Sequence, residues 1–429
     1  MTRHTLFPVL LVASTAFAQQ TPRDLKVQAD KTKVEAAGFW VYNDFAKAVA
    51  EAKASGRPIL AVLRCIPCEE CVKLDDDLVN EDPRVRPLLE KFVRVRIVST
   101  NGLDLSMFQF DTDQSFAAFL LNADGTIYGR FGTRSHRTSW ADDVSIDGLA
   151  KALQAALDLH AGYPANKAAF AGKRGPTPEF ASPEKDPALK DKFTSQIDYK
   201  GGVARSCIHC HQIGDAAKSL ARSRGLLSDE VLFPYPHPKA LGLVLDPKEK
   251  ATILRVEPGS PAEASGFHAG DAIAKLDRQP LVSMADVQWV LHRSPPGPVS
   301  IKADVVRGGT PMELTLSLPD GWRHRDDLSW RASSWGLRRM ALGGLLLETK
   351  PTGELAVKRA AQANGPHGTA YKAGFRTGDI IVEFDGLENP KRETDLFAHA
   401  LTKRRPGESV SVKVVRNGAT MTLPLVMQE

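Results

Sequence analysis

The C-terminal half of the sequence contains one motif twice, as Ala264-Ser265-Gly266-Phe267-His268-Ala269-Gly270-Asp271 and as Lys372-Ala373-Gly374-Phe375-Arg376-Thr377-Gly378-Asp379. The similarity continues downstream at a nearly constant offset, because Val305-Val306-Arg307-Gly308-Gly309 is matched by Val414-Val415-Arg416-Asn417-Gly418. Self-similarity at a fixed spacing is the signature of duplicated structural units. We therefore expect two copies of one domain in this half of the chain.

Each copy carries the signals of short antiparallel strands. The pairs Gly308-Gly309 and Asn417-Gly418 lie between alternating apolar and polar residues, which is typical of tight hairpin turns that need positive φ. Residues 284–293 and 395–401, each preceded by a Ser or Thr that can cap a helix, are predicted to be helical. Each unit is thus expected to be mostly β, with one helix beside its sheet.

These units resemble bacterial PDZ domains, over about 240–318 and 337–427. The resemblance implies a glycine-containing loop whose backbone N–H groups bind the terminal carboxylate of a peptide, which then extends the sheet as an added strand. Leu241-Gly242-Leu243 and Leu342-Gly343-Gly344-Leu345 stand where these peptide-binding loops are expected. The implied partners are the C-termini of proteins or peptides. The alternative is that the modules dock onto other parts of the same chain.

Exported PDZ pairs often belong to Deg/HtrA-type serine proteases, which need a nucleophilic Ser in a glycine-rich turn together with His and Asp. The sequence contains no Gly-x-Ser-x-Gly element, and its N-terminal half has a different order of strands. We therefore do not expect a serine protease.

The N-terminal half alternates the patterns of strands and helices. Apolar runs at 59–63 and 116–121 suit buried strands, 93–98 alternates, Ala123-Asp124-Gly125 marks a hairpin turn, and 146–159 has apolar residues at helical spacing. This order is that of an α/β sandwich. The predicted fold class is therefore multidomain, with an α/β sandwich at 37–163 followed by two mostly β modules of the barrel or sandwich kind.

A cysteine motif follows the first of these strands directly, as Arg64-Cys65-Ile66-Pro67-Cys68-Glu69-Glu70-Cys71-Val72-Lys73-Leu74. Cys-x-x-Cys at a strand-to-helix junction resembles thioredoxin-like proteins. The N-terminus of a helix favours the thiolate of the first sulfur, and a second cysteine one turn later lies within disulfide reach. The resemblance favours Cys68 and Cys71 as the catalytic pair, with Cys65 as an additional thiol.

Two departures from the thioredoxin-like pattern bear on this pair. The family has a cis-proline facing the disulfide, where alignment from the hairpin puts Phe116. Glu69 and Glu70 oppose the helix dipole and keep the pKa of the thiols relatively high, which favours a reductant or weak oxidant over a strong oxidase. The alternatives are a structural disulfide with a spare thiol, or a copper or zinc site with Cys65 as third ligand.

A second motif, Ser206-Cys207-Ile208-His209-Cys210-His211-Gln212, contains Cys-x-x-Cys-His, the attachment signature of haem c. Cys207 and Cys210 would form the thioethers and His211 would ligate the iron. We place this haem segment at 193–239. Candidates for the sixth ligand are His237, His160, Met284 and Met340. The alternatives are a simple disulfide, or a zinc site made by Cys207, Cys210, His209 and His211.

The first eighteen residues have the features of a secretory signal peptide: Arg3, an apolar run at 6–12, and Ala16-Phe17-Ala18 before Gln19. Since no later segment is long and apolar enough, we expect no transmembrane segment and a location in the periplasm or outside the cell. The 429 residues carry 56 basic and 51 acidic side chains with interleaved signs and no basic stripe with aromatics. Nucleic acid is therefore not an expected partner.

Two further segments separate the predicted domains. Residues 164–192 hold five prolines and many charges, and are expected to be a linker or an extended surface segment. Residues 319–336 contain three tryptophans, Trp322, Trp330 and Trp335, and are expected to be a packed interdomain hinge. A binding surface is the alternative for this connector.

A thioredoxin-like domain, a Cys-x-x-Cys-His segment and a PDZ pair, in this order, are similar to a bacterial thioredoxin-like/PDZ (seleno)protein family. The resemblance implies a redox theme. The leading hypothesis is an exported protein in which Cys68 and Cys71 exchange thiols and disulfides, covalent haem relays electrons, and the PDZ modules recruit a redox partner protein. The alternatives are a non-catalytic PDZ scaffold or redox sensor, and copper trafficking through the three-cysteine motif.

Overall fold

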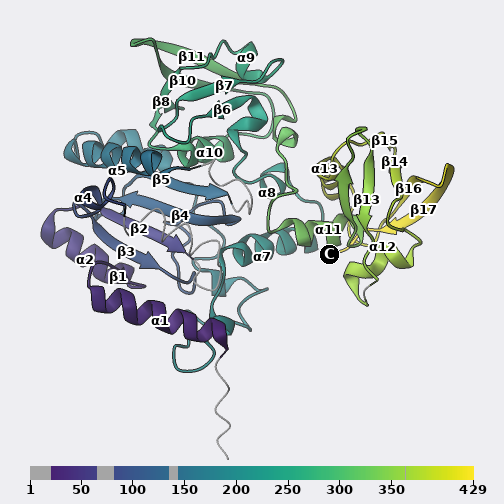
Figure 1. Ribbon diagram of the computed structural model, residues 1–429, viewed down its shortest axis with the longest axis horizontal. Helices are drawn as coiled ribbons and strands as arrows, with labels where there is room; N and C mark the ends of the chain where they lie inside the picture. The colour runs from purple at the N-terminus through teal and green to yellow at the C-terminus, as the bar shows by residue number, and fades with distance from the viewer. Residues whose placement is uncertain (1–20, 65–81, 135–143, 363) are drawn as a thin grey trace, which may run out of the picture.

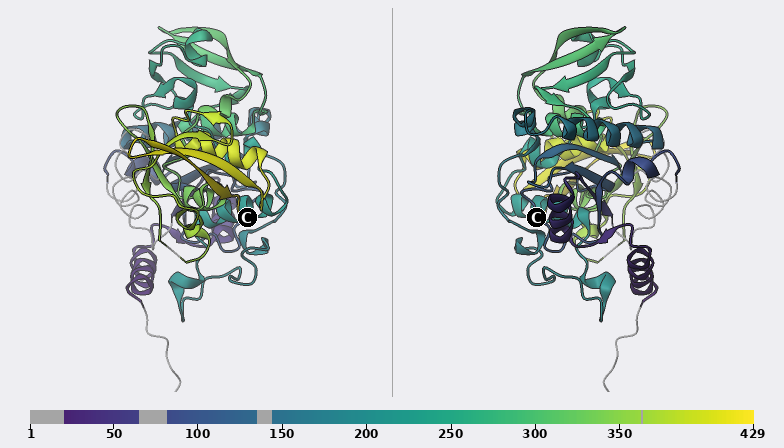
Figure 2. Two further views of the ribbon diagram at one scale, coloured as in Figure 1. Left: turned by 90° about the vertical axis from the view of Figure 1, so that its right-hand side faces the viewer. Right: turned by 90° about the vertical axis from the view of Figure 1, so that its left-hand side faces the viewer.

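The computed structural model describes residues 21–64, 82–134, 144–362 and 364–429. Figure 1 shows an N-terminal α/β body, a first repeat module beside α5 (Ile146–Ala161) and β5 (Ile127–Arg134), and a second repeat module that lies further away, beyond α7 (Cys210–Ser223). The views in Figure 2 show the same bodies from two sides. The predicted signal peptide lies outside the described residues. Within those residues, no helix combines the length and apolar content needed to span a membrane.

The N-terminal body is built on a five-stranded sheet in the order β1-β3-β2-β4-β5. β1 (Val41–Tyr42), β3 (Val93–Ile97) and β2 (Ile59–Arg64) run parallel to one another. β4 (Gln114–Leu121) pairs antiparallel with β2, and β5 (Ile127–Arg134) completes the hairpin. Because β2 and β3 are parallel, their carboxyl ends lie at the same edge of the sheet.

Both faces of this sheet are covered, as the sequence predicts for an α/β sandwich. Leu60 and Val62 of β2 belong to the hydrophobic cluster under α5 (Ile146–Ala161), whereas Leu63 belongs to the cluster under α2 (Phe45–Ser55). Successive side chains of a strand point to opposite faces, so one apolar strand serves two cores. The strands and the helix expected at 59–63, 93–98, 116–121 and 146–159 are therefore confirmed.

Two further helices belong to this body, and one of them lies within residues 83–92, where the sequence predicts a short helix. α4 (Arg86–Leu89) is a short helix that packs its Leu89 into the cluster under α5. α1 (Pro22–Ala37) was not predicted, because it is mostly charged and buries only three residues, Asp24, Val27 and Val34. The Asp24 carboxylate accepts the N–H of Ala204 at 2.8 Å, which holds α1 against α6 (Val203–Ser206).

The expected linker at 164–192 differs in the structure, because it is packed against the α/β body. η3 (Lys167–Lys173) buries Phe170 in the cluster under α5. η4 (Pro183–Lys185) places the carboxylate of Glu184 3.0 Å from the N–H of Gly102. The prolines and charges therefore belong to a segment with buried anchors of its own.

The segment that carries the second cysteine motif continues as helices. α7 (Cys210–Ser223) is its main element, and α8 (Asp229–Leu232) follows. Arg222, near the end of α7, is fully buried and donates to the carbonyls of Arg404 at 2.6 Å and Gln428 at 3.0 Å, both in the second repeat module. α7 thus joins the α/β body to the second module (Figure 1).

The first repeat module contains two small sheets, β6-β7 and β11-β10-β8-β9. Its strands are β6 (Leu243–Leu245), β7 (Ile253–Val256), β8 (Ala272–Leu276), β9 (Gln279–Pro280), β10 (Val299–Arg307) and β11 (Thr310–Leu318). Its helices are η5 (Pro238–Leu241), α9 (Pro261–Ala264) and α10 (Met284–Arg293). α10 has the bounds that the sequence predicts.

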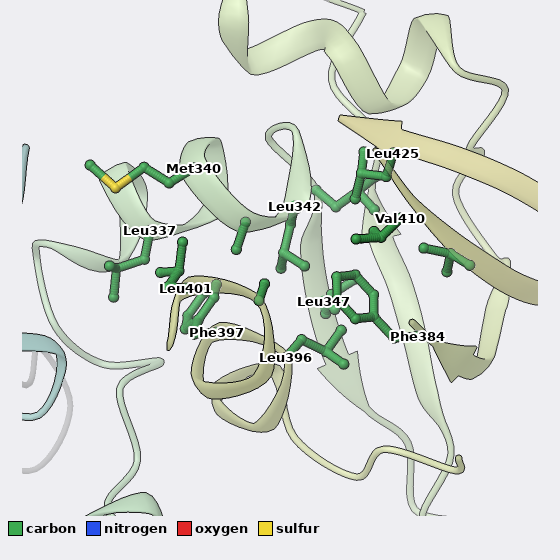
Figure 3. Packing of buried hydrophobic residues seen from close by; sticks show 14 of the residues in the cluster. Leu337, Met340, Leu342, Leu347, Phe384, Leu396, Phe397, Leu401, Val410 and Leu425 are labelled. Atoms are coloured by element: carbon green, nitrogen blue, oxygen red, sulfur yellow. The ribbon is translucent and has the colours of Figure 1, made fainter. Parts of the chain in front are cut away.

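The second repeat module has one sheet of six strands, with the main order β12-β13-β14-β16-β17 and β15 paired to β14. Its strands are β12 (Leu346–Thr349), β13 (Leu355–Arg359), β14 (Ile380–Phe384), β15 (Leu387–Glu388), β16 (Ser409–Arg416) and β17 (Ala419–Val426). Its helices are α11 (Ser334–Leu342), η7 (Pro366–Gly368), α12 (Thr369–Lys372) and α13 (Glu393–Lys403). Figure 3 shows α11 and α13 packed on each other and on the sheet through Leu337, Leu342 and Phe397, among others.

The duplicated sequence produces duplicated contacts. Ile273 of β8 lies opposite Val305, and Ile381 of β14 lies opposite Val414, so the two ladders have corresponding registers. The aspartate that ends each repeated motif is buried and binds an arginine from the following strand. Asp271 binds Arg307 at 2.7 Å, and Asp379 binds Arg416 at 2.6 Å.

The turns of the repeat also agree with the prediction. Gly308 and Gly309 have φ of 55° and 83°, and Asn417 and Gly418 have φ of 49° and 80°. Positive φ at both central residues is the geometry that two-residue hairpin turns require.

Candidate functional site

The first cysteine motif, with Cys65, Cys68 and Cys71, lies outside the described residues. What the structure describes is its start, because Cys65 follows Arg64, the last residue of β2. Arg64 is buried, and its guanidinium lies 3.2 Å from the carboxylate of Asp30 in α1. Phe116, at the position where the family has its cis-proline, is buried in β4 opposite Arg64.

The second cysteine motif is held against the residues that follow β3. The carbonyl of Ile208 accepts the N–H of Thr100 at 3.2 Å and its hydroxyl at 2.9 Å, and the N–H of Ile208 donates to Asn101 at 2.8 Å. The Sγ of Cys207 is 3.9 Å from the carbonyl oxygen of Val98. Cys207 therefore packs against the residues that follow the carboxyl end of β3.

Cys210 starts α7 and packs against the hydrophobic cluster under α2, within the α/β body. His209 precedes the helix as its N-cap, and its ring stacks on that of His211 with centroids 5.7 Å apart. Burial, together with the nearby charges of His211 and Arg23, lowers the pKa of His209 to about 4. Tyr199 lies in the same region, where burial and then the charge of Cys207 raise its pKa to about 12.

The three residues named by the haem prediction differ in their backbone and their surroundings. Cys207 has an extended backbone and is buried, with its sulfur turned to the Val98 carbonyl, whereas Cys210 begins the helix. His211, the expected iron ligand, is exposed. A pocket of about 330 Å³ lies along α7, but the helix lines it with Ile213, Ala217 and Leu220, among others, and His211 is not part of its wall.

His237, the candidate for the sixth ligand, has a place in the first repeat module. It is buried, caps η5, and its Nδ1 accepts the N–H of Lys239 at 3.0 Å. Among the described residues, no cluster of three or more His, Cys, Asp or Glu side chains has the arrangement of a metal site.

In the first repeat module, the helix beside the expected groove is docked on the α/β body. Lys173 and Asp286 form an ion pair of 2.8 Å with both side chains buried, and the indole of Trp289 donates to the carbonyl of Gly172 at 2.8 Å. Ser283 donates to the carbonyl of Arg130 in β5 at 2.5 Å. Burial lowers the pKa of Lys173 against the opposing charge of Asp286.

The peptide-binding loop predicted in this module, Leu241-Gly242-Leu243, lies between η5 and β6. Gly242 is left-handed with φ of 86°, and a Cβ there would meet Ser260 at 2.1 Å, so glycine is required. All three residues of β6 are buried. After β6, the carbonyl of Pro247 accepts the hydroxyl of Ser145 at 2.8 Å, so the end of this strand faces the start of α5.

The loop predicted in the second module, Leu342-Gly343-Gly344-Leu345, ends α11 and leads into β12. The N–H of Gly344 donates to the carbonyl of Arg338 at 3.0 Å, and the N–H of Leu345 donates to that of Leu342 at 3.1 Å. The glycines have φ of 59° and 90°, and a Cβ on Gly344 would meet the His367 carbonyl at 2.0 Å. The loop has the expected shape, but these N–H groups bind carbonyls of the same helix.

The connector at 319–336 is packed, but largely through arginines that the sequence did not mark. Arg323 is buried and donates to the carbonyls of Leu291, His292 and Ser294 at the end of α10. Arg331 is also buried, and its guanidinium is 2.8 Å from Asp111 and 3.3 Å from Asp113. 

The tryptophans of this region differ in their exposure. Trp322 is fully buried, whereas Trp335 is 52% exposed and stacks on His367. Arginine is usually exposed, so its burial cannot be predicted from the apolar pattern of the sequence. The pattern therefore indicated only the tryptophans as packed residues.

Comparison with known proteins defines the class of each body. Residues 40–123 match the thioredoxin-like family, and residues 239–318 and 363–426 match the PDZ domain family. The chain therefore consists of a thioredoxin-like domain followed by two PDZ domains, which confirms the predicted fold class. The second PDZ match begins after β13, although β12 and β13 belong to the same sheet.

The curated relatives are proteins named as probable periplasmic serine endoproteases of the DegP-like kind. The protein from Halomonas elongata is 28% identical over 205 residues, which are 46% of this chain and 41% of that protein. The protein from a Marinomonas species is 28% identical over 193 residues, which are 43% of this chain and 39% of that protein. The chain thus spans about two fifths of the length of these relatives.

Similar solved structures cover smaller parts of the chain. A serine endoprotease from Yersinia pestis is 26% identical over 20% of this chain and 28% of that chain, with a TM-score of 0.17. The HtrA-type protease AlgW with a decapeptide is 14% identical over 30% of this chain and 49% of that chain, with a TM-score of 0.20.

Proposed function

We propose that this protein is an exported thiol–disulfide redox protein of the thioredoxin-like class. The observation that carries the proposal is the position of the second cysteine motif. Cys207 lies against Val98, just after β3, and the first motif begins one residue after the neighbouring parallel strand β2. One cysteine motif thus follows the end of β2 in the sequence and the other packs against the end of the neighbouring strand β3, and a purely structural role for either motif does not require this proximity.

In the proposed reaction, the thiolate of Cys68 attacks a disulfide of a partner protein. A mixed disulfide forms and one partner sulfur leaves as a thiolate, which takes up a proton. Cys71 then loses its proton, attacks the sulfur of Cys68 and releases the second partner thiol. The partner gains two electrons and two protons, and a Cys68–Cys71 disulfide remains.

Insulin reduction coupled to dithiothreitol tests this proposal. We expect Cys68→Ser to lower the rate by on the order of 100-fold, since the attacking thiolate is lost. Ser206→Ala is the matched control, because it changes the residue beside the second motif and leaves all five cysteines in place. Reduction by Cys68→Ser at the wild-type rate would exclude the proposed role of this residue.

Covalent haem on Cys207 and Cys210 stays a prediction, and no step above depends on it. Its test is an absorption spectrum of protein matured in the periplasm, with a denaturing gel stained for haem. A Soret band that stays with the polypeptide under denaturation would establish attachment. A colourless protein from cells that mature other cytochromes c would exclude it.

The periplasm is the proposed location. The predicted signal peptide supports it, and so do the names of the DegP-like relatives, which place those proteins in the periplasm. 

Binding of protein C-termini by the PDZ domains is the second candidate function. The observation in its favour is the outer edge of β12, where Glu348 and Thr349 are exposed, in contrast to the buried β6. We therefore propose the second PDZ domain as the one that receives a partner. Isothermal titration with peptides of free and amidated C-terminus tests this function, and equal affinity for both forms would exclude recognition of a terminus.

A further inference from the structure

The outer edge of β12 in the second PDZ domain is bound by a side chain of the same domain. The N–H of Leu347 donates to Oε1 of Glu393 at 3.1 Å. Glu393 is the first residue of α13, the helix beside the expected groove. Its carboxylate is 4% exposed.

Leu347 is in the position from which β12 would pair with an added strand. β12 pairs on one side with β13, as the sheet order shows, and its other side faces α13. In an antiparallel strand, N–H groups of alternate residues point to opposite sides. Because the N–H of Leu347 reaches a carboxylate on α13, it points away from β13, toward the groove.

Arg338 holds this carboxylate in place. Its guanidinium binds Glu393 with two nitrogens, Nε at 2.9 Å from Oε1 and Nη2 at 2.6 Å from Oε2. Paired N–H···O bonds of this kind fix the orientation of a carboxylate and are stronger than neutral hydrogen bonds. Arg338 belongs to α11, and its own carbonyl binds Gly344 in the predicted carboxylate-binding loop.

A second hydrogen bond joins β12 to the segment that leads into α13. The hydroxyl of Thr349 donates to the carbonyl of Lys391 at 2.7 Å. Two residues apart on β12, Leu347 and Thr349 therefore both bind the segment that starts α13. The loop N–H groups of Gly344 and Leu345 bind α11 carbonyls, so these four groups all have hydrogen-bond partners within the domain.

We propose that Glu393 is an internal ligand of the second PDZ domain. Its carboxylate occupies the strand edge and Arg338, and the groove opens only to an extended peptide whose own carboxylate replaces it on Arg338. The proposal rests on the second candidate function, the binding of peptides by this domain. It names the chemistry of the partner: a segment with a free carboxylate beside a backbone that can pair with β12.

The requirement for a carboxylate follows from the surroundings of Arg338. Its side chain is 14% exposed, so displacement of Glu393 by a neutral peptide would leave a largely buried guanidinium without its counter-charge. Removal of one partner from a buried ion pair is strongly unfavourable. A peptide that supplies a carboxylate restores the pair, whereas an amidated peptide does not.

The first PDZ domain has no equivalent of this contact. α10 begins with Met284 where α13 begins with Glu393, and a thioether is at most a weak acceptor for an N–H group. Among the described residues, no side chain forms a hydrogen bond with the backbone of β6. The internal ligand is therefore a property of the second domain.

The test is fluorescence anisotropy with the full chain and labelled decapeptides that end in Val, Leu, Phe or Ala, each with a free or an amidated C-terminus. We expect Glu393→Ala to bind at least one free-carboxylate peptide about tenfold more tightly than wild type, because the competing acceptor is gone. The amidated form of the same peptide should bind Glu393→Ala no more tightly than it binds wild type. Glu393→Gln, which keeps a neutral acceptor, should lie between them.

The matched control is Glu383→Ala, which removes an acidic residue of the same domain whose ion pair with Lys413 lies on the sheet surface. It should bind like wild type. Exchange of the Leu347 amide hydrogen, measured in parallel, should accelerate in Glu393→Ala and not in Glu383→Ala. The amides that pair β16 with β17 should exchange at the wild-type rate in both variants, which shows that both are folded.

The two kinds of failure are distinguishable. If wild type and Glu393→Ala bind the same peptides equally, the internal ligand is wrong and peptide binding stands. If neither binds any peptide although the Leu347 amide exchanges faster in the variant, peptide recognition by this domain is wrong, and the proposal with it.

Discussion

The two PDZ domains arise from one repeated sequence, yet they use the helix beside the groove differently. In the first domain, α10 packs on the thioredoxin-like domain through Asp286, Trp289 and Ser283. In the second domain, Glu393, the first residue of α13, accepts a hydrogen bond from the N–H of Leu347 in β12 of the same domain. The repeated motif fixes the fold of both domains, whereas side chains outside the motif decide what each helix binds.

Loss of the Asp286 carboxylate should disturb the docking of α10 on the thioredoxin-like domain, and it has the largest expected effect. Asp286→Ala leaves the ammonium of Lys173 buried without its counter-charge, so we expect the free energy of unfolding to fall by about 3–5 kcal/mol. The first PDZ domain should separate from the thioredoxin-like domain, with faster proteolysis between them. Urea denaturation and limited proteolysis measure both effects.

Asp395 is the matched position in α13 and serves as the control. Its carboxylate binds Arg392 at 2.6 Å, and the two side chains are 26% and 39% exposed. We expect Asp395→Ala to cost about 1 kcal/mol or less. Equal losses for Asp286→Ala and Asp395→Ala would contradict the different roles assigned to the two helices.

The Asp–Arg ion pair occurs in both PDZ domains, so the two domains should respond alike when it is removed. Arg307→Ala and Arg416→Ala each leave a buried aspartate without its charged donor. We expect each substitution to lower the free energy of unfolding by about 2 kcal/mol. Denaturation of both variants in urea measures this, and a difference of twofold or more between them would show that the repeat is not equivalent in energy.

The smallest expected effect is a dependence of stability on pH that originates in the first domain. His292 of α10 stacks on Tyr235, and burial, followed by the charges of Arg323 and Arg293, lowers its pKa to about 3. The unfolded chain has a histidine pKa near 6.5, so it binds the proton first as the pH falls. Stability from this group is therefore complete above about pH 6.5 and is lost as the pH falls toward 3.

Between pH 7 and pH 5.5 this group should cost about 1 kcal/mol of stability. His292→Phe keeps a ring against Tyr235 but cannot be protonated, so its urea midpoint should fall less over this range than that of wild type. His209, with its lowered pKa, contributes in the same direction in both proteins. Parallel pH curves for the two proteins would rule out His292 as a source.

The sequence predicts the elements of this fold well where local signals are strong. The buried strand at 59–63 is apolar on both faces, and the hairpin pairs Gly308-Gly309 and Asn417-Gly418 require positive φ, so neither depends on distant residues. α1 was not predicted, because it is a charged helix with few apolar positions. Its stability depends on contacts such as that of Asp24 with Ala204, which lie far apart in the sequence.

The candidate sites show the same limit. The loop Leu342-Gly343-Gly344-Leu345 could be located from its glycines, but the use of its N–H groups by α11 could not. The pairing of Glu393 with Arg338 and Leu347 joins residues that are 55 and 46 positions apart. Such contacts are set by tertiary packing and leave no periodic trace in the sequence.

The helix α7 has a consequence for any attempt to divide this protein. Its first residue, Cys210, is partly buried against the core of the thioredoxin-like domain, while Arg222 near its last turn is buried and binds two carbonyls of the second PDZ domain. Fourteen residues of helix make a rod of about 21 Å. A fragment that ends before this helix loses the contact of Cys210 with the thioredoxin-like core, and one that starts after it leaves the carbonyls of Arg404 and Gln428 without the buried guanidinium that binds them. The two ends of the chain are therefore best studied as one piece.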